Sequence, residues 1–232
     1  MTGLSPRLRE FVDELPEERH TVLAFVSAVA SQLPAGTRIL DAGAGNAPYR
    51  ELFAHCDYVT ADWENSPHEH APVVDIHGSL EDLPLADSSF DVVLSTQVLE
   101  HVSEPLSVLR ELHRITRPGG RVFLTVPLVW ELHEEPFDYF RYTPHGVRHL
   151  LTAAGFVVES ITPRNGYFTT LASLARTATW TIWSTDGGRE AERTLVDRLL
   201  RGLAAMLPAF DELDEVRRLP LGYACVASRP RQ

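Results

Sequence analysis

The sequence predicts an α/β protein whose core is a doubly wound parallel sheet with helices on both faces. Short apolar segments with strand character alternate with helical segments over most of the 232 residues. The first of these strands, residues 38–41, runs directly into a glycine turn, and ligands in such sheets bind at the carboxyl ends of the strands. Hydrophobic residues make up 44% of the chain, which is enough for a sizeable core.

The elements follow in order from apolar periodicity and from the residues that end it. Pro34 to Gly36 ends a helical region, residues 63–72 form a loop because they are rich in His, Glu, Pro and Asn, and Pro118 to Gly120 forms a turn. The expected strands are residues 38–41, 58–61, 73–76, 91–94, 121–126, 156–161 and 223–227. The expected helices are one or two within residues 4–33, then residues 47–54, a short helix near Leu99, residues 105–115, residues 143–155 and most of residues 168–210.

The composition argues against several classes of function. The formal net charge is −11, so neither a nucleic acid, which needs clustered positive charge, nor an anionic membrane surface is an expected partner. No apolar run reaches the roughly 20 residues that cross a bilayer, and residues 1–14 lack an apolar export signal. Cys56 and Cys225 fit no metal or redox spacing, so we expect a cytoplasmic protein. All 21 basic residues are Arg, which excludes a lysine base.

The glycine turn after the first strand, residues 41–48, is the first candidate ligand site. Small residues let the backbone approach a ligand, and the following segment offers free N–H groups. A turn of this kind also serves simply to pack a strand against a helix. A nicotinamide dinucleotide would need a small residue at position 48, and Pro48 disfavours it. Asp62 ends the second strand, where a carboxylate can accept both hydroxyls of a ribose, although a solvated Asp at a strand end is common.

Several ordered segments resemble the class I S-adenosylmethionine-dependent methyltransferases. The segments are Ile39–Gly45, Gly78–Leu85, Ser89–Val93, Val98–His101, Leu109–Leu112 and Arg117–Gly120. The resemblance covers roughly residues 36–162 and the last strand. It implies a Rossmann-like sheet with the strand order 3-2-1-4-5-7-6, in which strand 7 is antiparallel.

The resemblance also implies where S-adenosylmethionine binds. Gly43 and Gly45 would approach its methionine part, and Asp62 would hold the ribose. Asn46 is a further expected cofactor-binding residue. Ser79 and Leu80 would flank the adenine, and Gln97 would lie beside the sulfonium. The family often has Asp where this chain has Ser79, and a hydroxyl can still accept a hydrogen bond from the adenine amino group. Asp41 is expected either to touch the cofactor or to orient the glycine turn.

The acceptor is expected beneath the segment 130–143, which leaves the fifth strand and is rich in aromatic and ionisable residues. His133 is the predicted base, because His titrates near neutral pH. Tyr139 and Arg141 are the other predicted catalytic residues, as groups that orient the acceptor. Trp130, Tyr142 and His101 are predicted to contact it. In the alternative interpretation, the aromatic residues of this segment cover the sheet and Arg141 pairs with Glu134 or Asp138.

A metal site is a further alternative. Gln97, Glu100 and His101 would share one helical face at positions i, i+3 and i+4, and could converge with His133. The neutral amide of Gln97 is a poor ligand for a hard cation, so the sequence interpretation assigns no metal.

The chain divides into four predicted parts: N-terminal cap helices at 1–35, a cofactor-binding core at 36–162, a helical insertion at 163–220 that acts as a substrate cap, and a final strand and tail at 221–232. The predicted function is methylation of a small metabolite by a monomer or homodimer, with a hydroxyl of a natural product or sugar as acceptor. N-methylation, and cofactor binding without catalysis, are the alternatives.

Overall fold

The computed structural model describes residues 4–63, 74–183 and 188–231, and seven strands in it form one sheet. The strands are β1 (Arg38–Ala42), β2 (Asp57–Asp62), β3 (Ile76–His77), β4 (Phe90–Thr96), β5 (Thr116–Pro127), β6 (Val157–Pro163) and β7 (Gly222–Ser228). Their order is β3-β2-β1-β4-β5-β7-β6, and β7 runs antiparallel to both of its neighbours. The predicted fold class and strand order are therefore confirmed.

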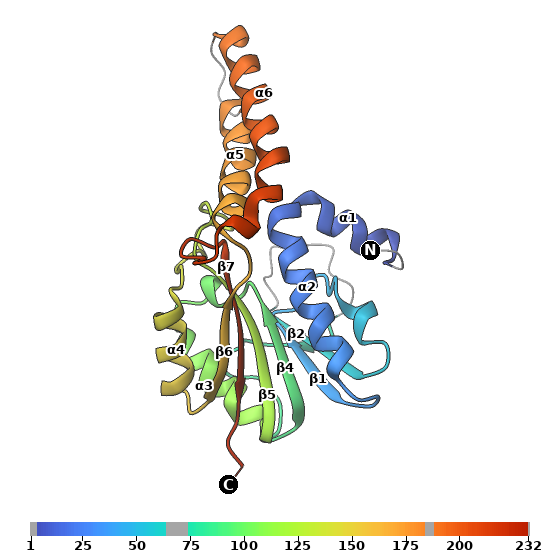
Figure 1. Cartoon of the computed structure of the whole chain (residues 1–232). Helices are drawn as coiled ribbons and strands as arrows, with labels where there is room; N and C mark the ends of the chain where they lie inside the picture. The colour runs from blue at the N-terminus through green and yellow to red at the C-terminus, as the bar shows by residue number, and fades with distance from the viewer. Residues whose placement is uncertain (1–3, 64–73, 184–187, 232) are drawn as a thin grey trace.

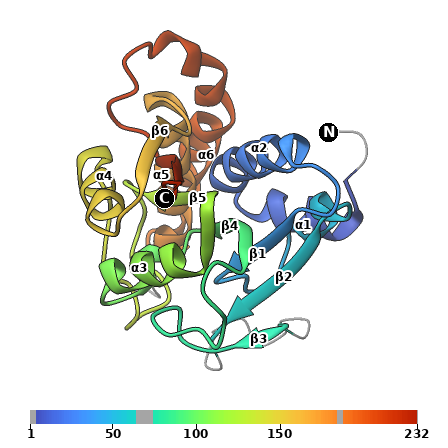
Figure 2. The ribbon, with the colours of Figure 1, turned by 90° about the horizontal axis from the view of Figure 1, so that it is seen from below.

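Helices cover both faces of the sheet (Figures 1 and 2). Helices α1 (Pro6–Glu14) and α2 (Pro16–Gln32) pack on one face, and α3 (Pro105–Ile115) and α4 (Pro144–Ala153) pack on the other. Alternate residues along β1 point to opposite faces: Ile39 belongs to the α1–α2 core and Leu40 to the α3–α4 core. Strand β1, which the sequence predicted as an apolar strand, is thus buried on both sides beyond Arg38.

Proline begins each of these four helices. Its fixed φ suits the first helical turn, where its missing N–H would have no partner in the helix. Two of the helices also carry a side-chain cap. Ser5 accepts a hydrogen bond from the Leu8 N–H at 3.2 Å, and Thr143 accepts one from the Gly146 N–H at 3.0 Å. These local signals mark the starts of α3 and α4, which were predicted at residues 105 and 143.

The segment after the glycine turn differs from the prediction. Instead of an α-helix at 47–54, the chain forms only a 3₁₀ helix, η1 (Arg50–Phe53). Ala47 has φ 46°, in the left-handed region, so the predicted α-helix cannot begin at this residue. The helix predicted near Leu99 is likewise a single 3₁₀ turn, η2 (Leu99–His101).

Two smaller predictions concern strand boundaries. The predicted turn at 118–120 lies within β5, where the register against β4 shifts between Phe90 and Val92. Strand β3 begins at Ile76, so Val74 and Asp75 of the predicted strand 73–76 precede it, and residue 73 lies outside the described residues. Residues 64–72 of the predicted loop lie outside the described residues.

A helical hairpin follows β6, made of α5 (Tyr167–Trp183), α6 (Glu190–Met206) and the 3₁₀ helix η3 (Leu207–Leu213). It extends beyond the carboxyl ends of the strands (Figure 1). Its base is attached to α2, because Arg176 forms hydrogen bonds with Glu17 at 2.6 to 3.0 Å. Within the described part of the chain, no helix has both the length and the apolar content that a bilayer span requires.

Candidate active site

Two adjoining cavities open at the carboxyl ends of β1, β2 and β4. The larger cavity has a volume of about 410 Å³, and the smaller one has about 210 Å³. Gly43, Gln97, His101 and Glu134 line both of them. Two ligands could therefore lie side by side with these four residues between them.

The glycine turn forms part of the wall that both cavities share. Gly43 has φ +77°, and a Cβ at this position would lie 2.5 Å from Val98 Cγ2. The Gly43 and Ala44 N–H groups donate to the Ala61 carbonyl at 2.9 and 3.1 Å. The turn is therefore closed against Val98, and its conformation and its packing both require glycine at position 43. Gly45 and Asn46 line the smaller cavity.

Asp62 connects the end of β2 to the glycine turn. Its Oδ2 accepts a hydrogen bond from the Gly45 N–H at 2.6 Å, and its Oδ1 accepts one from the Trp63 N–H at 2.8 Å. The residue is buried and lines the larger cavity. Each carboxylate oxygen can accept more than one hydrogen bond, so the carboxylate can still receive hydroxyl donors from a ligand.

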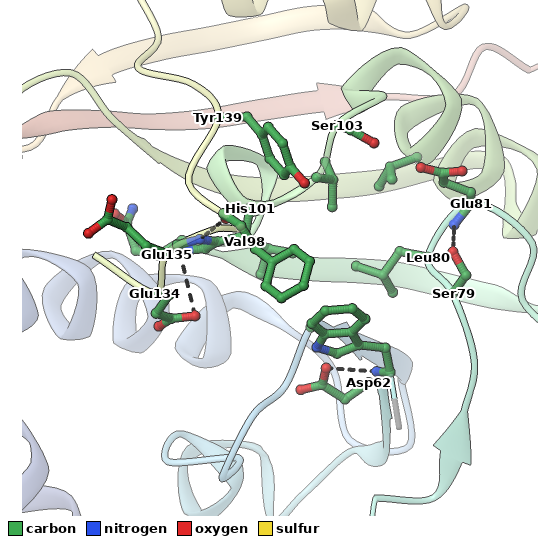
Figure 3. A pocket seen from close by; sticks show the side chains of 16 residues that line it. Asp62, Ser79, Leu80, Glu81, Val98, His101, Ser103, Glu134, Glu135 and Tyr139 are labelled. Atoms are coloured by element: carbon green, nitrogen blue, oxygen red, sulfur yellow. Dashed lines mark hydrogen bonds and ion pairs between the residues drawn. The ribbon is translucent and has the colours of Figure 1, made fainter. Parts of the chain in front are cut away.

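The far side of the larger cavity is formed by the segment predicted to flank an adenine (Figure 3). Leu80 gives it a buried apolar surface, and the Ser79 hydroxyl accepts a hydrogen bond from the Glu81 N–H at 3.2 Å. Trp63 and Phe137 meet edge to face with 5.1 Å between ring centroids and line the same cavity. The sequence interpretation did not single out these two aromatic residues, although Trp63 directly follows Asp62.

Asp41 lines the smaller cavity and is 2% exposed. Its Oδ2 accepts a hydrogen bond from the Tyr58 hydroxyl. Burial raises the pKa of the Asp41 carboxyl to about 6, and the hydrogen bond from Tyr58 opposes this change. The hydrogen bond places Asp41 as an anchor between β1 and β2 at the start of the turn.

Gln97 lies between the two cavities but does not continue a helix. Its φ is +54°, its N–H donates to the Thr125 carbonyl at 3.1 Å, and its side-chain amide donates to Thr125 Oγ1 at 2.9 Å. The expectation that it shares a helical face with Glu100 and His101 is wrong, because η2 begins only at Leu99. Its side chain is held by β5 instead.

The segment 130–143 passes over the smaller cavity, where Trp130 and His133 line the wall. The Asp138 carboxylate supports His133: its Oδ2 accepts a hydrogen bond from the His133 N–H at 3.0 Å and lies 3.3 Å from His133 Nδ1. Arg141 pairs with the same carboxylate at 2.5 and 2.9 Å. Hydrogen bonds from Arg141 keep the pKa of Asp138 well below its usual range.

Two predicted site residues build this segment and do not line either cavity. Arg141 donates to the Glu131 carbonyl at 2.7 Å and to Asp138, so it has the structural role of the alternative interpretation. Tyr142 is 4% exposed, and its hydroxyl donates to the Leu99 carbonyl at 2.7 Å. Tyr139 lines the larger cavity, on the opposite side from Asp62 (Figure 3). Arg141 and Tyr142 therefore line neither cavity, and their contacts with the acceptor stay predictions.

Glu100, His101 and His133 come together beside the smaller cavity. One ligand atom from each lies within 4.8 Å of the others, and the two imidazole rings meet edge to face at 4.7 Å. Glu100 is 1% exposed, and burial raises its pKa to about 8. Burial also lowers the pKa of His101. Such environments are typical of functional sites.

The N-terminal helices contribute the outer wall of the smaller cavity. Its lining residues from these helices are Phe11, Leu15, Glu18, Arg19 and Val22. The buried Arg164 fixes Glu18 with a contact of 2.8 Å to Oε1 and a hydrogen bond of 2.9 Å to Oε2. Amphipathic periodicity predicted the helices, but the sequence did not indicate which of their residues face a cavity. Among the described residues of the helical insertion 163–220, none lines either cavity. The role of this insertion as a substrate cap stays a prediction.

Comparison with known proteins identifies the type of domain. Residues 40–124 match the family described as a methyltransferase domain. A probable S-adenosylmethionine-dependent methyltransferase of Mycolicibacterium smegmatis is 34% identical over 143 residues, which are 54% of each chain. The ubiquinone biosynthesis O-methyltransferase of Xanthomonas oryzae is 31% identical over 133 residues, 50% of this chain and 55% of the relative. The chain thus matches about half the length of these relatives.

A solved structure extends the comparison to nearly the whole fold. The [4+2]-cyclase SpnF superposes with a TM-score of 0.59 at 20% identity, covering 93% of this chain and 82% of that one. At this identity, the likeness shows a common fold and does not decide the reaction.

Proposed function

We propose, from the premise that this chain belongs to the class I S-adenosylmethionine-dependent methyltransferases, that it transfers a methyl group to a hydroxyl oxygen of a small metabolite. One observation carries the proposal. Two adjoining cavities share Gly43 and Gln97, and the smaller one is bordered by Glu100, His101 and His133. This arrangement suits a donor and an acceptor with a proton-accepting group beside them.

The residues of the larger cavity fit the cofactor. Gly43 lines this cavity with its backbone, because its place against Val98 leaves no room for a side chain. Asp62 offers a carboxylate for ribose hydroxyls, and Leu80 offers an apolar surface for a base. When bound, S-adenosylmethionine supplies an electrophilic methyl group on a sulfonium, and the task of the protein is to position and desolvate the acceptor.

The smaller cavity is the proposed acceptor site. Helices α1 and α2 close it against solvent on one side, and Trp130 and His133 border it on the other. The Nδ1 of His133 is engaged by the Glu131 carbonyl at 3.1 Å, which makes Nδ1 the hydrogen-bond donor and leaves Nε2 free to accept a proton. The Asp138 carboxylate near Nδ1 would stabilise the imidazolium that results.

Two considerations favour a small hydroxylated acceptor. The cavity volume of about 210 Å³ excludes a macromolecule from its interior. The Xanthomonas oryzae relative is named as an O-methyltransferase. A natural-product or sugar hydroxyl, a cytoplasmic location and a monomeric or homodimeric state remain parts of this proposal.

Calorimetry and mass spectrometry test the proposal. We expect S-adenosylhomocysteine to bind the protein and NADH not to bind. Incubation with S-adenosylmethionine and a panel of hydroxylated and aminated metabolites should yield products 14 mass units heavier for a hydroxylated member. Absence of S-adenosylhomocysteine binding would refute the methyltransferase assignment, and methylation of amines alone would refute O-transfer.

A further inference from the structure

We propose that Glu100, His101 and His133 form a binding site for a divalent first-row transition metal ion, for which Zn²⁺ is the best match. The site lies beside the smaller cavity, next to the wall shared with the larger one. Binding of the ion depends only on these side chains. Its role in catalysis, described below, rests on the proposed function.

The spacing of the three groups is close to that of a metal site. Their ligand atoms lie within 4.8 Å of one another, and the bonds of a tetrahedral Zn²⁺ site place ligand atoms roughly 3.4 Å apart. His133 lies on the segment 130–143 and the other two residues lie in η2, so small rotations of side chains from two independent elements would close the remaining distance.

In both histidines, Nε2 is the nitrogen left to bind a metal ion. His101 Nδ1 lies 2.8 Å from the Phe137 carbonyl, and His133 Nδ1 lies 3.1 Å from the Glu131 carbonyl. A carbonyl oxygen can only accept, so each Nδ1 carries the hydrogen and each neutral ring keeps a lone pair on Nε2. Metal-binding histidines are oriented in this way, by donating their other nitrogen to a carbonyl or a carboxylate.

Glu100 supplies the observation that points most directly to a ligand. Its side chain is 1% exposed and lines the smaller cavity, and Oε2 has no hydrogen-bond partner within the described residues. A buried carboxylate oxygen without a partner costs folding free energy. The nearest cationic candidate, His101 Nε2, lies 4.0 Å from Oε1 and carries no hydrogen in the tautomer above. A metal ion would satisfy the carboxylate and both imidazoles together.

The surroundings favour a cation. Glu134 Oε2 lies 4.0 Å from His101 Nε2, and Asp138 lies 3.3 Å from His133 Nδ1 (Figure 3 shows the first pair). Asp138 is itself fixed by Arg141, so the histidine that it supports is held in place. Carboxylates behind metal-bound histidines increase the basicity of the ligand and orient the ring.

The donor set indicates which ion would bind. Two imidazoles and one carboxylate suit Zn²⁺ and its first-row neighbours, whereas Mg²⁺ and Ca²⁺ prefer oxygen ligands alone. Three protein ligands leave a coordination position open, as in catalytic zinc sites. An acceptor hydroxyl in that position would lose its proton more readily. In this form of the enzyme, His133 Nε2 is a ligand to the metal and does not accept the proton itself.

The test uses the untagged 232-residue chain, stripped of metal with a chelator. Zn²⁺ binding is measured by calorimetry, and Co²⁺ binding is measured by its visible absorption, which reports low coordination number with nitrogen ligands. The variants are Glu100→Gln and His133→Ala. The matched control is His149→Ala, which removes an exposed histidine from α4. Circular dichroism and S-adenosylhomocysteine binding show which variants remain folded, and Asp138→Asn replaces His133→Ala if the latter does not fold.

We expect one ion per chain in the unmodified protein and in the control. Glu100→Gln and His133→Ala should lower the affinity for Zn²⁺ at least about 100-fold, and Asp138→Asn by about 10-fold to 100-fold. Absence of Zn²⁺ binding, or equal affinity in all variants and the control, would overturn the site. Failure to bind S-adenosylhomocysteine would count against the proposed function alone, because Zn²⁺ binding is measured without that ligand.

Discussion

The Gly45 N–H donates a hydrogen bond to the Asp62 carboxylate at 2.6 Å, across 17 residues of sequence. This bond joins the glycine turn after β1 to the end of β2, the two features from which a nucleoside site was predicted. Spacing in the sequence indicated that the two features serve the same ligand. The structure adds that they also hold each other, so a change at Asp62 acts on the shape of the turn as well as on the ligand.

Asp62→Ala should therefore reduce cofactor affinity and stability together. The substitution leaves the Gly45 and Trp63 N–H groups without their acceptor, which costs about 1–3 kcal/mol for each group that stays buried. We expect affinity for S-adenosylhomocysteine to fall at least about 10-fold in calorimetry and the free energy of unfolding to fall in denaturant titrations. Asp62→Asn keeps one acceptor oxygen. Its affinity and its free energy of unfolding should therefore lie between those of the unmodified protein and Asp62→Ala. Unchanged affinity in Asp62→Ala would exclude Asp62 from the cofactor site.

Gly43→Ala tests the close approach in the turn, and Gly36→Ala is its matched control. Both glycines have φ +77°, but a Cβ at Gly36 has no atom within 4 Å, whereas a Cβ at Gly43 would overlap Val98. Backbone strain of about 1–2 kcal/mol is common to both substitutions, and the overlap adds about 1–3 kcal/mol at Gly43 alone. Denaturant titrations should show this difference, and only Gly43→Ala should weaken S-adenosylhomocysteine binding. Equal effects of the two substitutions would show that packing against Val98 is unimportant.

The fold could be predicted because its signals are local. Alternating burial along β1, proline at the start of four helices and the turn at Gly43 each act within a few residues. The direction of a side chain that depends on distant contacts could not be predicted. Tyr142 is an aromatic residue of the type that often binds ligands. Its hydroxyl, however, donates a hydrogen bond to the Leu99 carbonyl, 43 residues away. Nothing close to Tyr142 in the sequence reveals that partner.

The same dependence on distant contacts explains which parts of the candidate site could be predicted. A position after a strand was enough to indicate Asp62, because parallel strands bring their carboxyl ends together. The approach of His133 to His101, however, depends on how the segment 130–143 folds back over η2. That path is set by pairs such as Asp138 with Arg141. Asp138 and Arg141 are close in sequence. From residue types alone, however, Glu134 was an equally good partner for Arg141.

Asp41 makes the stability of the protein depend on pH. Burial raises its pKa from 3.8 to about 6, so the folded state favours the protonated carboxyl more than the unfolded state does. The stabilisation of the folded state by this raised pKa is fully present below pH 3.8. It is lost as the pH rises through about 6. Asp41→Asn stays neutral and can still accept the hydrogen bond from Tyr58. Relative to this variant, the unmodified protein should lose roughly 2 kcal/mol of unfolding free energy between pH 4 and pH 7. Denaturant titrations at both pH values measure this loss, and a difference that does not vary with pH would contradict it.

His133→Ala should lower turnover and leave cofactor binding intact. His133 lines only the smaller cavity, so its removal leaves the Gly43 and Asp62 contacts unchanged. Its Nε2 is available to accept the acceptor proton or to bind an ion, and both roles predict a decrease in kcat of about 10²-fold to 10⁴-fold. Affinity for S-adenosylhomocysteine should stay within a factor of about 3. His149→Ala, at an exposed position on α4, is the control and should keep full turnover. Turnover that survives in His133→Ala would show that the proton leaves the acceptor without this residue, and the imidazole would then serve only to pack against His101.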